Sequence, residues 1–299
     1  MNTLNLIVNS YLKLKNYGMP YWIMTPMRRF VRNIAHRYLP KYLEKPVEKS
    51  QNRQEGLIVS FTSFPARIKE VWQVVECMKR QSLLPEKIIL WLSKEQFPNR
   101  ESVPQSLWDR VDELFTIRFV EGDIRSHKKY YYASKEYPNK LIFLIDDDIY
   151  YDTDIINRSV KEYTNQNGRC VVCNYGYQIK CDKSGSLSYS KWIPVESRRE
   201  GKNLFFGSGG GTLFKPLDLY KDLTKIELAL LLTPIADDIW LNTMVLKENL
   251  LKVILSNGPL LSVHIKDNIK LSSINIGMGK NDEQLLAIKK YYGDVFNTN

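Results

Sequence analysis

The residues best suited to a chemical role are three adjacent aspartates, Asp146, Asp147 and Asp148, within LIFLIDDDIYY (Leu141–Tyr151). Five apolar residues precede them, which predicts a buried strand over Leu141–Ile145 with the aspartates at its carboxyl end. A core strand does not tolerate unpaired charges, and a surface loop does not require an apolar segment before it. The pattern therefore indicates a site that holds positive charge.

The alternation of side chains in extended backbone says which carboxylates could act together. If the extended geometry continues past the strand, Asp146 and Asp148 point to one side and Asp147 to the other. Two carboxylates on one side suit Mg²⁺ or Mn²⁺, which usually takes one or two carboxylates together with substrate phosphates. Without a cation the neighbouring carboxylates would raise one another's pKa. The alternative is a solvated acidic turn after a strand.

Three later features narrow the choice among metal-dependent enzymes. GSGGG (Gly207–Gly211) lets backbone amides approach a ligand, although it could also be a flexible loop. ADDIWL places Asp237 and Asp238 at the start of an amphipathic segment, where helix capping is the alternative. His264 follows an apolar segment, and a lone histidine in such a place is more often structural than a metal ligand.

The elements that must position these residues follow from apolar periodicity. In the first half, predicted strands alternate with predicted helices, which is typical of crossover units that build a parallel sheet. Ligands bind such sheets outside the carboxyl ends of the strands. The predicted strands are Leu57–Phe61, Lys87–Leu92, Thr116–Val120 and Leu141–Ile145, and the predicted helices are Ile68–Gln81, Gln105–Phe115 and Ser126–Tyr137. In the less regular second half we predict strands at Cys170–Ile179, Leu187–Ile193, Thr212–Phe214 and Lys252–Leu255, and a helix at Asp237–Leu246.

The order of the motifs, with an acidic trio, a glycine loop, an acidic pair before a helix and a late histidine, resembles a GT-A glycosyltransferase. The segments IVSFTSFPARI, VVECMKRQSLLPEKIILWL and SKEQFP resemble bacterial enzymes that build capsule or O-antigen sugars. The resemblance runs from about Gly56 to about Lys266. It implies an α/β fold with a Rossmann-like, mixed but mainly parallel sheet flanked by helices. The expected organisation is a basic, aromatic-rich helical arm (1–55), a GT-A catalytic domain (56–270) and a helical tail (271–299).

The resemblance also implies roles for individual residues. Asp146 and Asp148 would bind a metal, Mn²⁺ or Mg²⁺, that bridges the nucleotide diphosphate, and His264 would complete the metal site. Asp147 would lie near the ribose or support the turn. The donor-binding residues it implies are Thr62, Ser63, Phe64 and Arg67 beside the base and ribose, Lys128 and Lys129 beside the diphosphate, and Gly209, Gly210 and Gly211 beside the donor sugar and acceptor. For either lysine, a solvated charge on a helix is the alternative.

The general base implied by the resemblance is Asp238, or Asp237 beside it. Members of the family often have a Glu-Asp pair where this chain has two aspartates, so the choice stays open. The expected activity is metal-dependent, inverting transfer of a hexose, such as galactose in pyranose or furanose form, from a nucleotide diphosphate sugar. UDP is the expected nucleotide, and the acceptor a growing cell-surface polysaccharide or a lipid-linked glycan. The alternatives are a metal-dependent phosphoryl-transfer or nuclease enzyme, and a non-catalytic carbohydrate-binding or membrane-scaffolding protein.

Charge is distributed unevenly along the 299 residues. Residues 1–55 hold ten Lys/Arg and three Glu, a balance of +7, so the rest of the chain carries only +3 of the total of +10. The basic and aromatic run YGMPYWIMTPMRRFVRNIAHRYLPKYL suits a peripheral contact with anionic membrane. It equally suits a helical arm packed on the main domain or on another subunit of a homo-oligomer. Nucleic acid is disfavoured as a partner because the remainder is nearly balanced in charge.

The rest of the composition constrains location and cysteine chemistry. No apolar run reaches the roughly 18 residues of a membrane span, and the N-terminus lacks the features of a signal peptide. Four cysteines do not make a disulfide framework, so a cytoplasmic protein is expected, either free or peripheral on the inner face of the membrane. Cys170, Cys173 and Cys181 form C-x₂-C-x₇-C, but a strand would turn the first two to opposite faces and a fourth zinc ligand is missing. Buried thiols are the favoured interpretation.

Overall fold

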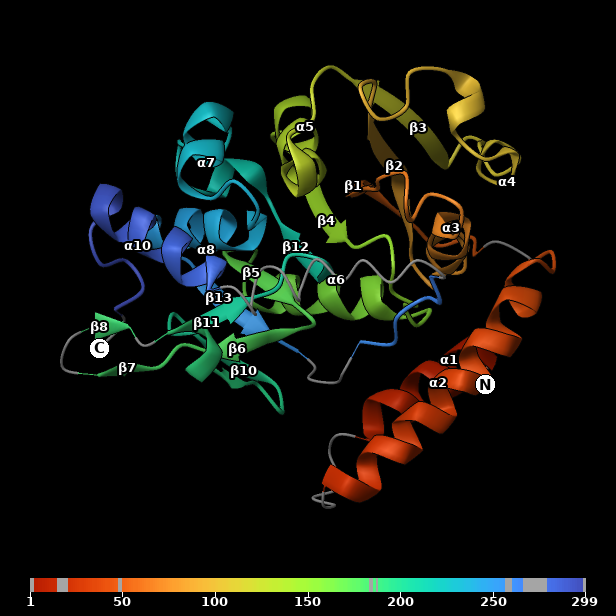
Figure 1. Cartoon of the computed structure of the whole chain (residues 1–299), viewed down its shortest axis with the longest axis horizontal. Helices are drawn as coiled ribbons and strands as arrows, with labels where there is room; N and C mark the ends of the chain where they lie inside the picture. The colour runs from red at the N-terminus through yellow and green to blue at the C-terminus, as the bar shows by residue number, and fades with distance from the viewer. Residues whose placement is uncertain are drawn as a thin grey trace.

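The computed structural model describes residues 3–14, 21–47, 50–182, 185–186, 188–255, 260–265 and 279–297 (Figure 1). Its centre is an eight-stranded sheet with the order β10-β13-β5-β12-β4-β1-β2-β3. In chain order these strands are β1 (Arg53–Thr62), β2 (Leu84–Ser93), β3 (Phe115–Val120), β4 (Leu141–Ile145), β5 (Cys170–Cys173), β10 (Arg199–Gly201), β12 (Gly210–Phe214) and β13 (Leu251–Ile254). A three-stranded sheet and a short hairpin contain β6 (Gly176–Gln178), β9 (Ile193–Pro194) and β11 (Leu204–Phe206), and β7 (Cys181–Asp182) and β8 (Gly185–Ser186).

Helices cover both faces of the large sheet (Figure 1). The α-helices in the described part of the chain are α1 (Thr3–Lys13), α2 (Tyr21–Leu43), α3 (Val71–Lys79), α4 (Gln105–Trp108), α5 (Lys128–Glu136), α6 (Ile155–Asn165), α7 (Ile226–Leu232), α8 (Asp237–Lys247) and α10 (Lys280–Tyr292). Strands β4, β1, β2 and β3 are parallel, β12 runs antiparallel between β4 and β5, and β13 is parallel to β5. The predicted fold class is confirmed: a mixed, mainly parallel sheet flanked by helices, with a helical N-terminal arm.

The central strands form because their residues are apolar on both faces. Val59 and Phe143 belong to the core cluster shared with α3, α6 and the N-terminal helices. Their neighbours Ile58 and Ile142 belong to the cluster on the other face, shared with α5, α7, α8 and α10. A strand buried on both sides reads as a continuous apolar run, which is why β2 and β4 stand out in the sequence.

One predicted helix in the first half of the chain is wrong in extent. The predicted helix Gln105–Phe115 ends at Trp108, and the Asp112 carboxylate then accepts hydrogen bonds from the backbone N–H groups of Leu114 and Phe115 (2.9 and 2.8 Å). These bonds give the backbone an alternative to the helix.

The second half departs from prediction in two further places. The predicted strand Cys170–Ile179 divides into β5 and β6, which belong to different sheets. Within the predicted strand Leu187–Ile193, residues Tyr189–Lys191 form a 3₁₀ turn, and Leu187 lies outside the described residues.

The expected division into arm, catalytic domain and tail stays a prediction, although two observations bear on its limits. Strand β1 begins at Arg53, so the last residues assigned to the arm belong to the sheet. Leu285 and Ile288 of α10 lie in the same core cluster as Trp240 of α8, so this helix packs against the body. The proposed boundary at residue 270 falls within 266–278, outside the described residues.

The N-terminal helices α1 and α2 form a hairpin that projects from one side of the sheet (Figure 1). The buried guanidinium of Arg80 joins its end to α3. It donates hydrogen bonds to the carbonyl oxygens of Leu43 (2.9 Å) and Lys45 (2.6 Å) and forms an ion pair with Glu76.

Within the described residues no single helix is long and apolar enough to span a membrane. The pair α7 and α8, bent by 113°, meets the length and composition criteria together.

Replacing Arg80 by methionine tests this attachment. We expect Arg80→Met to lower the free energy of unfolding by about 2–4 kcal/mol, because buried carbonyl oxygens lose charge-assisted hydrogen bonds. Urea denaturation measures the change. Arg53→Met is the control, since Arg53 pairs with Glu113 at side-chain exposures of 39% and 73%, and such a pair contributes at most about 1 kcal/mol. Equal losses in the two variants would contradict the assignment.

Candidate functional site

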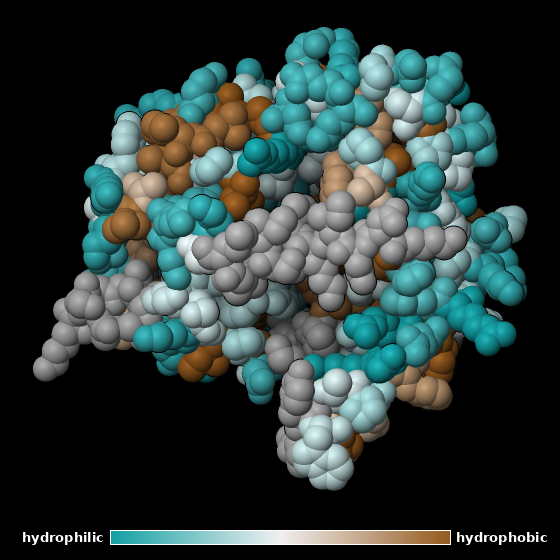
Figure 2. Space-filling view, in the orientation of Figure 1, coloured by the Kyte–Doolittle hydropathy of each residue, from teal (hydrophilic) through white to brown (hydrophobic). Residues whose placement is uncertain are grey.

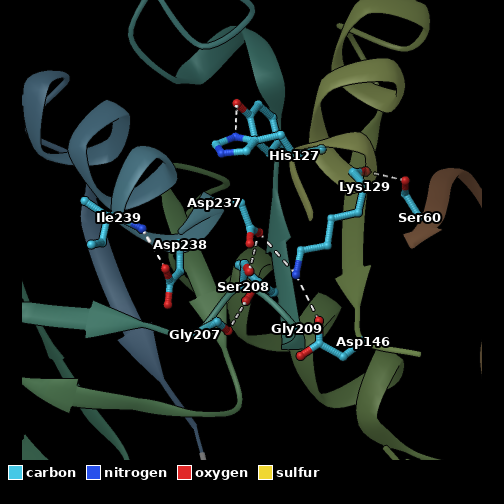
Figure 3. A network of polar contacts seen from close by, with 12 residues as sticks. Ser60, His127, Lys129, Asp146, Gly207, Ser208, Gly209, Asp237, Asp238 and Ile239 are labelled. Carbon is cyan, nitrogen blue, oxygen red and sulfur yellow. Dashed lines mark hydrogen bonds and ion pairs between the residues drawn. The ribbon is translucent and has the colours of Figure 1, made fainter. Parts of the chain in front are cut away.

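The carboxyl end of β4 and the start of α8 are joined by one buried lysine (Figure 3). The ammonium of Lys129, on α5, lies 2.9 Å from Asp146 Oδ1 and 3.1 Å from Asp237 Oδ2. Its backbone is held in turn by Ser60 of β1, whose hydroxyl donates to the Lys129 carbonyl and accepts from Trp91 Nε1 (2.9 Å). The two acidic motifs, far apart in the sequence, therefore share one cation.

The charges in this group reinforce one another. Burial by itself would lower the pKa of Lys129, but Asp146 and Asp237 outweigh it and hold that pKa above its ordinary value. Burial likewise favours a higher pKa for Asp237, but Lys129, His127 and a hydrogen bond from Ser208 Oγ (2.6 Å) outweigh it, so the pKa of Asp237 is lowered. Asp237 is therefore a fixed, ionised group whose Oδ2 is already engaged by Lys129 and Ser208.

Asp238, next in the chain, has the opposite electrostatic character. Burial and the adjacent charge of Asp237 raise its pKa to about 7. Its Oδ1 accepts a hydrogen bond from the Ile239 N–H (2.9 Å), and Oδ2 has no hydrogen-bond partner among the residues the structure describes. Figure 3 shows its carboxylate turned away from Lys129. A partly buried carboxyl with this pKa and a free oxygen can accept a proton near neutral pH.

The aspartate trio is not extended as the sequence suggested, because the chain turns after Asp146. Arg67 Nη1 lies 2.9 Å from Asp147 Oδ1 and 2.9 Å from Asp148 Oδ2, so these two carboxylates share an arginine. Ser63 Oγ donates to the other oxygen of Asp147 (2.5 Å). The predicted arrangement, with Asp147 pointing away from its two neighbours, is therefore wrong.

Burial and neighbouring charges act on these two carboxyls as well. Burial raises the pKa of Asp147, although Arg67 and Ser63 oppose the shift. Burial and the charge of Asp147 raise the pKa of Asp148 to about 7. Arg67 carries one positive charge and does not neutralise both carboxylates, so the site favours a further cation.

The glycine loop approaches the trio through one residue. A Cβ on Gly209 would lie 1.8 Å from the carboxyl carbon of Asp146, so only glycine fits. The Gly209 carbonyl accepts hydrogen bonds from the Asp146 N–H (3.1 Å) and from the hydroxyl of Tyr151 (2.5 Å). Gly209 thus determines where the Asp146 carboxylate lies.

A divalent cation fits part of this donor set. No hydrogen bond reaches Asp146 Oδ2 or Asp148 Oδ1 from the described part of the chain, which leaves each carboxylate one hard oxygen to offer. His264 is exposed, and its ring centroid lies 5.0 Å from that of His36. Its segment does run beside the aspartates, since the Val263 N–H donates to the Asp148 carbonyl (2.7 Å).

Among the described residues, no three His, Cys, Asp or Glu side chains are grouped as metal ligands. The carboxylates therefore fit Mg²⁺ or Mn²⁺ held jointly with ligand phosphates better than a complete protein cage. The role predicted for His264 stays a prediction.

The remaining predicted residues have varied surroundings. Thr62 Oγ1 donates to the Trp91 carbonyl (2.8 Å), and the Arg67 guanidinium lies 5.3 Å from the centroid of the Phe64 ring. Lys128 is paired with Asp123 instead of sharing the site of Lys129.

Gly210 and Gly211 are buried in β12, although the resemblance placed them beside the donor sugar. A Cβ on Gly210 would lie 2.6 Å from Tyr175 Cβ, and a Cβ on Gly211 would lie 2.9 Å from Ile155 Cδ1. Gly211 also has φ +93, a conformation that favours glycine. These contacts explain both glycines by close packing, and Gly209 alone faces the trio.

Besides Ser60, sequence reasoning missed three residues of the network. Ser208 lies inside the GSGGG motif and Tyr151 directly follows the acidic trio, so both could have been found by their position. His127 gave no signal: it is fully buried, with Nε2 2.7 Å from the Thr233 carbonyl and Nδ1 3.0 Å from the Tyr130 hydroxyl. Cys170 and Cys173 are buried free thiols, as favoured, whereas the free thiol of Cys181 is only half-buried.

Comparison with known proteins gives only distant similarities. No family model matches the chain, and no curated protein matches it. Among solved structures, UDP-glucose pyrophosphorylase complexed with UDP-glucose has a TM-score of 0.39 and 11% identity, over 81% of this chain and 98% of that one.

Two further solved structures are similarly remote. 4-diphosphocytidyl-2C-methyl-D-erythritol synthase gives 0.41 and 10%, over 78% and 100% of the two chains. HddC from Yersinia pseudotuberculosis gives 0.36 and 10%, over 55% and 77%. Similarities this low do not establish a family or an activity.

Removing the shared cation tests the network. We expect Lys129→Met to destabilise the protein by about 3–5 kcal/mol at pH 8, because two carboxylates lose their buried partner. The deficit should shrink towards pH 5, since carboxyls freed from the lysine take up protons more readily and a neutral acid costs less to bury. Urea titrations at both pH values measure it. Lys94→Met, which removes an exposed pair with Glu121, should change stability by at most about 1 kcal/mol, and a pH-independent loss in Lys129→Met would contradict the role.

Proposed function

We propose that the protein is a metal-dependent inverting glycosyltransferase that moves a hexose from a nucleotide diphosphate sugar, with UDP as the first nucleotide to test. The observation that supports this most is the ionic network of Asp146, Lys129 and Asp237. It brings the aspartate trio and the acidic pair of α8 together at the carboxyl end of β4. That edge is where open α/β sheets bind their ligands.

The donor's diphosphate and a divalent metal fit the aspartate trio. Asp146 and Asp148 each have one oxygen free to hold Mn²⁺ or Mg²⁺, which would act as a Lewis acid towards the negative charge of the leaving diphosphate. Ser63 and Arg67 fix Asp147 and thereby the turn that presents its two neighbours. On the resemblance, the nucleotide lies beside the same Ser63–Arg67 segment.

The acceptor's activation fits Asp238 better than Asp237. Asp238 would take the proton from the acceptor hydroxyl, and the freed oxygen would bond to the anomeric carbon. The bond between that carbon and the diphosphate oxygen breaks as the new one forms, and its electron pair leaves with the nucleotide. One base and direct attack from the opposite face invert the anomeric configuration. Asp237, held by Ser208 and Lys129, would orient the start of α8.

The acceptor class rests on the sequence resemblance alone. It points to a growing cell-surface polysaccharide, such as capsule or O-antigen, or to a lipid-linked glycan. A metal-dependent phosphoryl or nucleotidyl transferase could use the same carboxylates, but it would cleave between phosphates instead of at the anomeric carbon. The products therefore separate the two activities.

A panel of nucleotide sugars identifies the donor. We expect one UDP-hexose to raise the melting temperature in the presence of Mn²⁺ and much less without it, because the diphosphate and the aspartates share the ion. Asp148→Asn should lose most of the Mn²⁺-dependent shift, while Glu121→Gln, at an exposed surface position, should keep it. Stabilisation by no nucleotide sugar, or release of inorganic pyrophosphate from a nucleoside triphosphate, would overturn the proposal.

Substitution and pH profile test the base. Asp238→Asn should lower kcat about 10²–10⁴-fold with little change in donor affinity, because proton removal is lost while the diphosphate site remains. In the unaltered protein, kcat should fall about tenfold per unit below pH 7. Asp238 has a pKa raised to about 7 and acts only when deprotonated. Product NMR should show inversion, and retained configuration would rule out the single-base mechanism.

A further inference from the structure

Helix α2 presents an apolar stripe to solvent. Its members follow one another at intervals of three and four residues, which places them along one side of the helix. They are Met27, Phe30, Ile34 and Tyr38, with exposures of 40%, 66%, 41% and 49%. Trp22, at the start of the helix, is 73% exposed. So much exposed apolar and aromatic surface on one helix is typical of an interaction site.

The other side of the same helix accounts for its fixed position. Ala35, Leu39 and Leu43 are buried in the core cluster that also contains Leu4 and Val8 of α1. The stripe is therefore not a face that the hairpin needs for its own packing. The hairpin projects from one side of the sheet in Figure 1, and its end is visible below the body in Figure 2.

Charge on the hairpin has one sign. Residues 1–43 contain seven Lys/Arg and no Asp or Glu. Arg29, Arg37 and Lys41 are exposed on α2 and form no ion pair with any described residue. The stripe thus lies among uncompensated positive charges.

We propose that this face of α2 docks on an anionic lipid surface, with the helix lying in the plane of the headgroups. The apolar side chains would enter the boundary between headgroups and acyl chains, and the basic side chains would meet lipid phosphates. A second copy of the chain fits less well, because a symmetric contact would bring like charges together. The inference goes beyond the proposed transfer reaction and does not depend on it.

The contacts of the hairpin give this docking a consequence for the site. The Asn5 side chain forms hydrogen bonds with the Thr153 N–H (2.7 Å) and hydroxyl (2.8 Å). His36 Nε2 lies 2.9 Å from the Ser262 carbonyl. Thr153 follows the aspartate trio by five residues, and Ser262 precedes Val263, whose N–H donates to the Asp148 carbonyl. A lipid-bound α2 would therefore hold the site at a fixed position near the membrane surface.

Sedimentation with lipid vesicles tests the proposal, with neither metal nor nucleotide present. We expect the full chain to bind phosphatidylcholine vesicles containing about 30 mol% phosphatidylglycerol, and to bind pure phosphatidylcholine weakly. Added salt should weaken the binding. Arg29→Gln with Arg37→Gln should lower the partition coefficient about 30-fold, at roughly fivefold per charge. Phe30→Ser with Ile34→Ser should lower it at least about tenfold.

Matched controls separate the stripe from general effects. Lys221→Gln with Lys225→Gln removes the same net charge from exposed positions on the body, and Leu217→Ser removes an apolar side chain of the body that is 61% exposed. Both should bind vesicles nearly as well as the unaltered protein, and thermal melts should show every variant folded.

Three results would overturn the proposal. They are no binding to anionic vesicles, equal loss in the control variants, and an oligomer, seen by light scattering, that the α2 substitutions dissociate without affecting sedimentation. Because no donor or metal is present, these outcomes are independent of whether sugar transfer is confirmed.

Discussion

A single buried ammonium, that of Lys129, holds the candidate site together. Carboxylates away from water are costly unless they are paired, and the Lys129 ammonium lies within 3.1 Å of oxygens from both Asp146 and Asp237. These three residues come from α5, the end of β4 and the start of α8. The ion pairs therefore fix how three elements meet, as well as neutralising charge. The Gly209 carbonyl and the Ser208 hydroxyl complete the surroundings of the two carboxylates from the glycine loop between them.

Asp237 and Asp238 are adjacent in the chain, but the start of α8 directs their side chains into different surroundings. Asp237 faces Lys129 and Ser208, and its pKa is lowered although burial opposes the shift. Asp238 faces away, and burial next to the charge of Asp237 raises its pKa to about 7. One helix start thus supplies a permanently charged group and a titrating group. Environments that push two pKa values apart in this way are typical of an acid or base paired with an electrostatic partner.

The sequence predicts best those features that are set by burial. Strand β4 was predicted with the limits it has, because five apolar residues buried on both faces leave no other interpretation. Features set by local hydrogen bonds were not predicted. After α4 the Asp112 carboxylate binds backbone N–H groups, and the predicted helix does not continue. The direction of the aspartates was also mispredicted. A turn follows Asp146, and that turn depends on Arg67 and Ser63, which are distant in the sequence.

The same reasoning explains which site residues a pattern can reveal. Charged groups at the end of an apolar strand can be recognised in the sequence, because burying them is costly and they therefore require a partner. The sequence does not identify that partner. Lys128 and Lys129 are equivalent in sequence, and only the fold turns one towards Asp123 and the other towards Asp146. The N-terminal hairpin follows this logic too. Its inner residues are explained by the core, whereas the aromatic and basic residues of its outer face have no partner within the described chain that would explain them. The apolar and basic residues of that outer face are what the proposed lipid contact would account for.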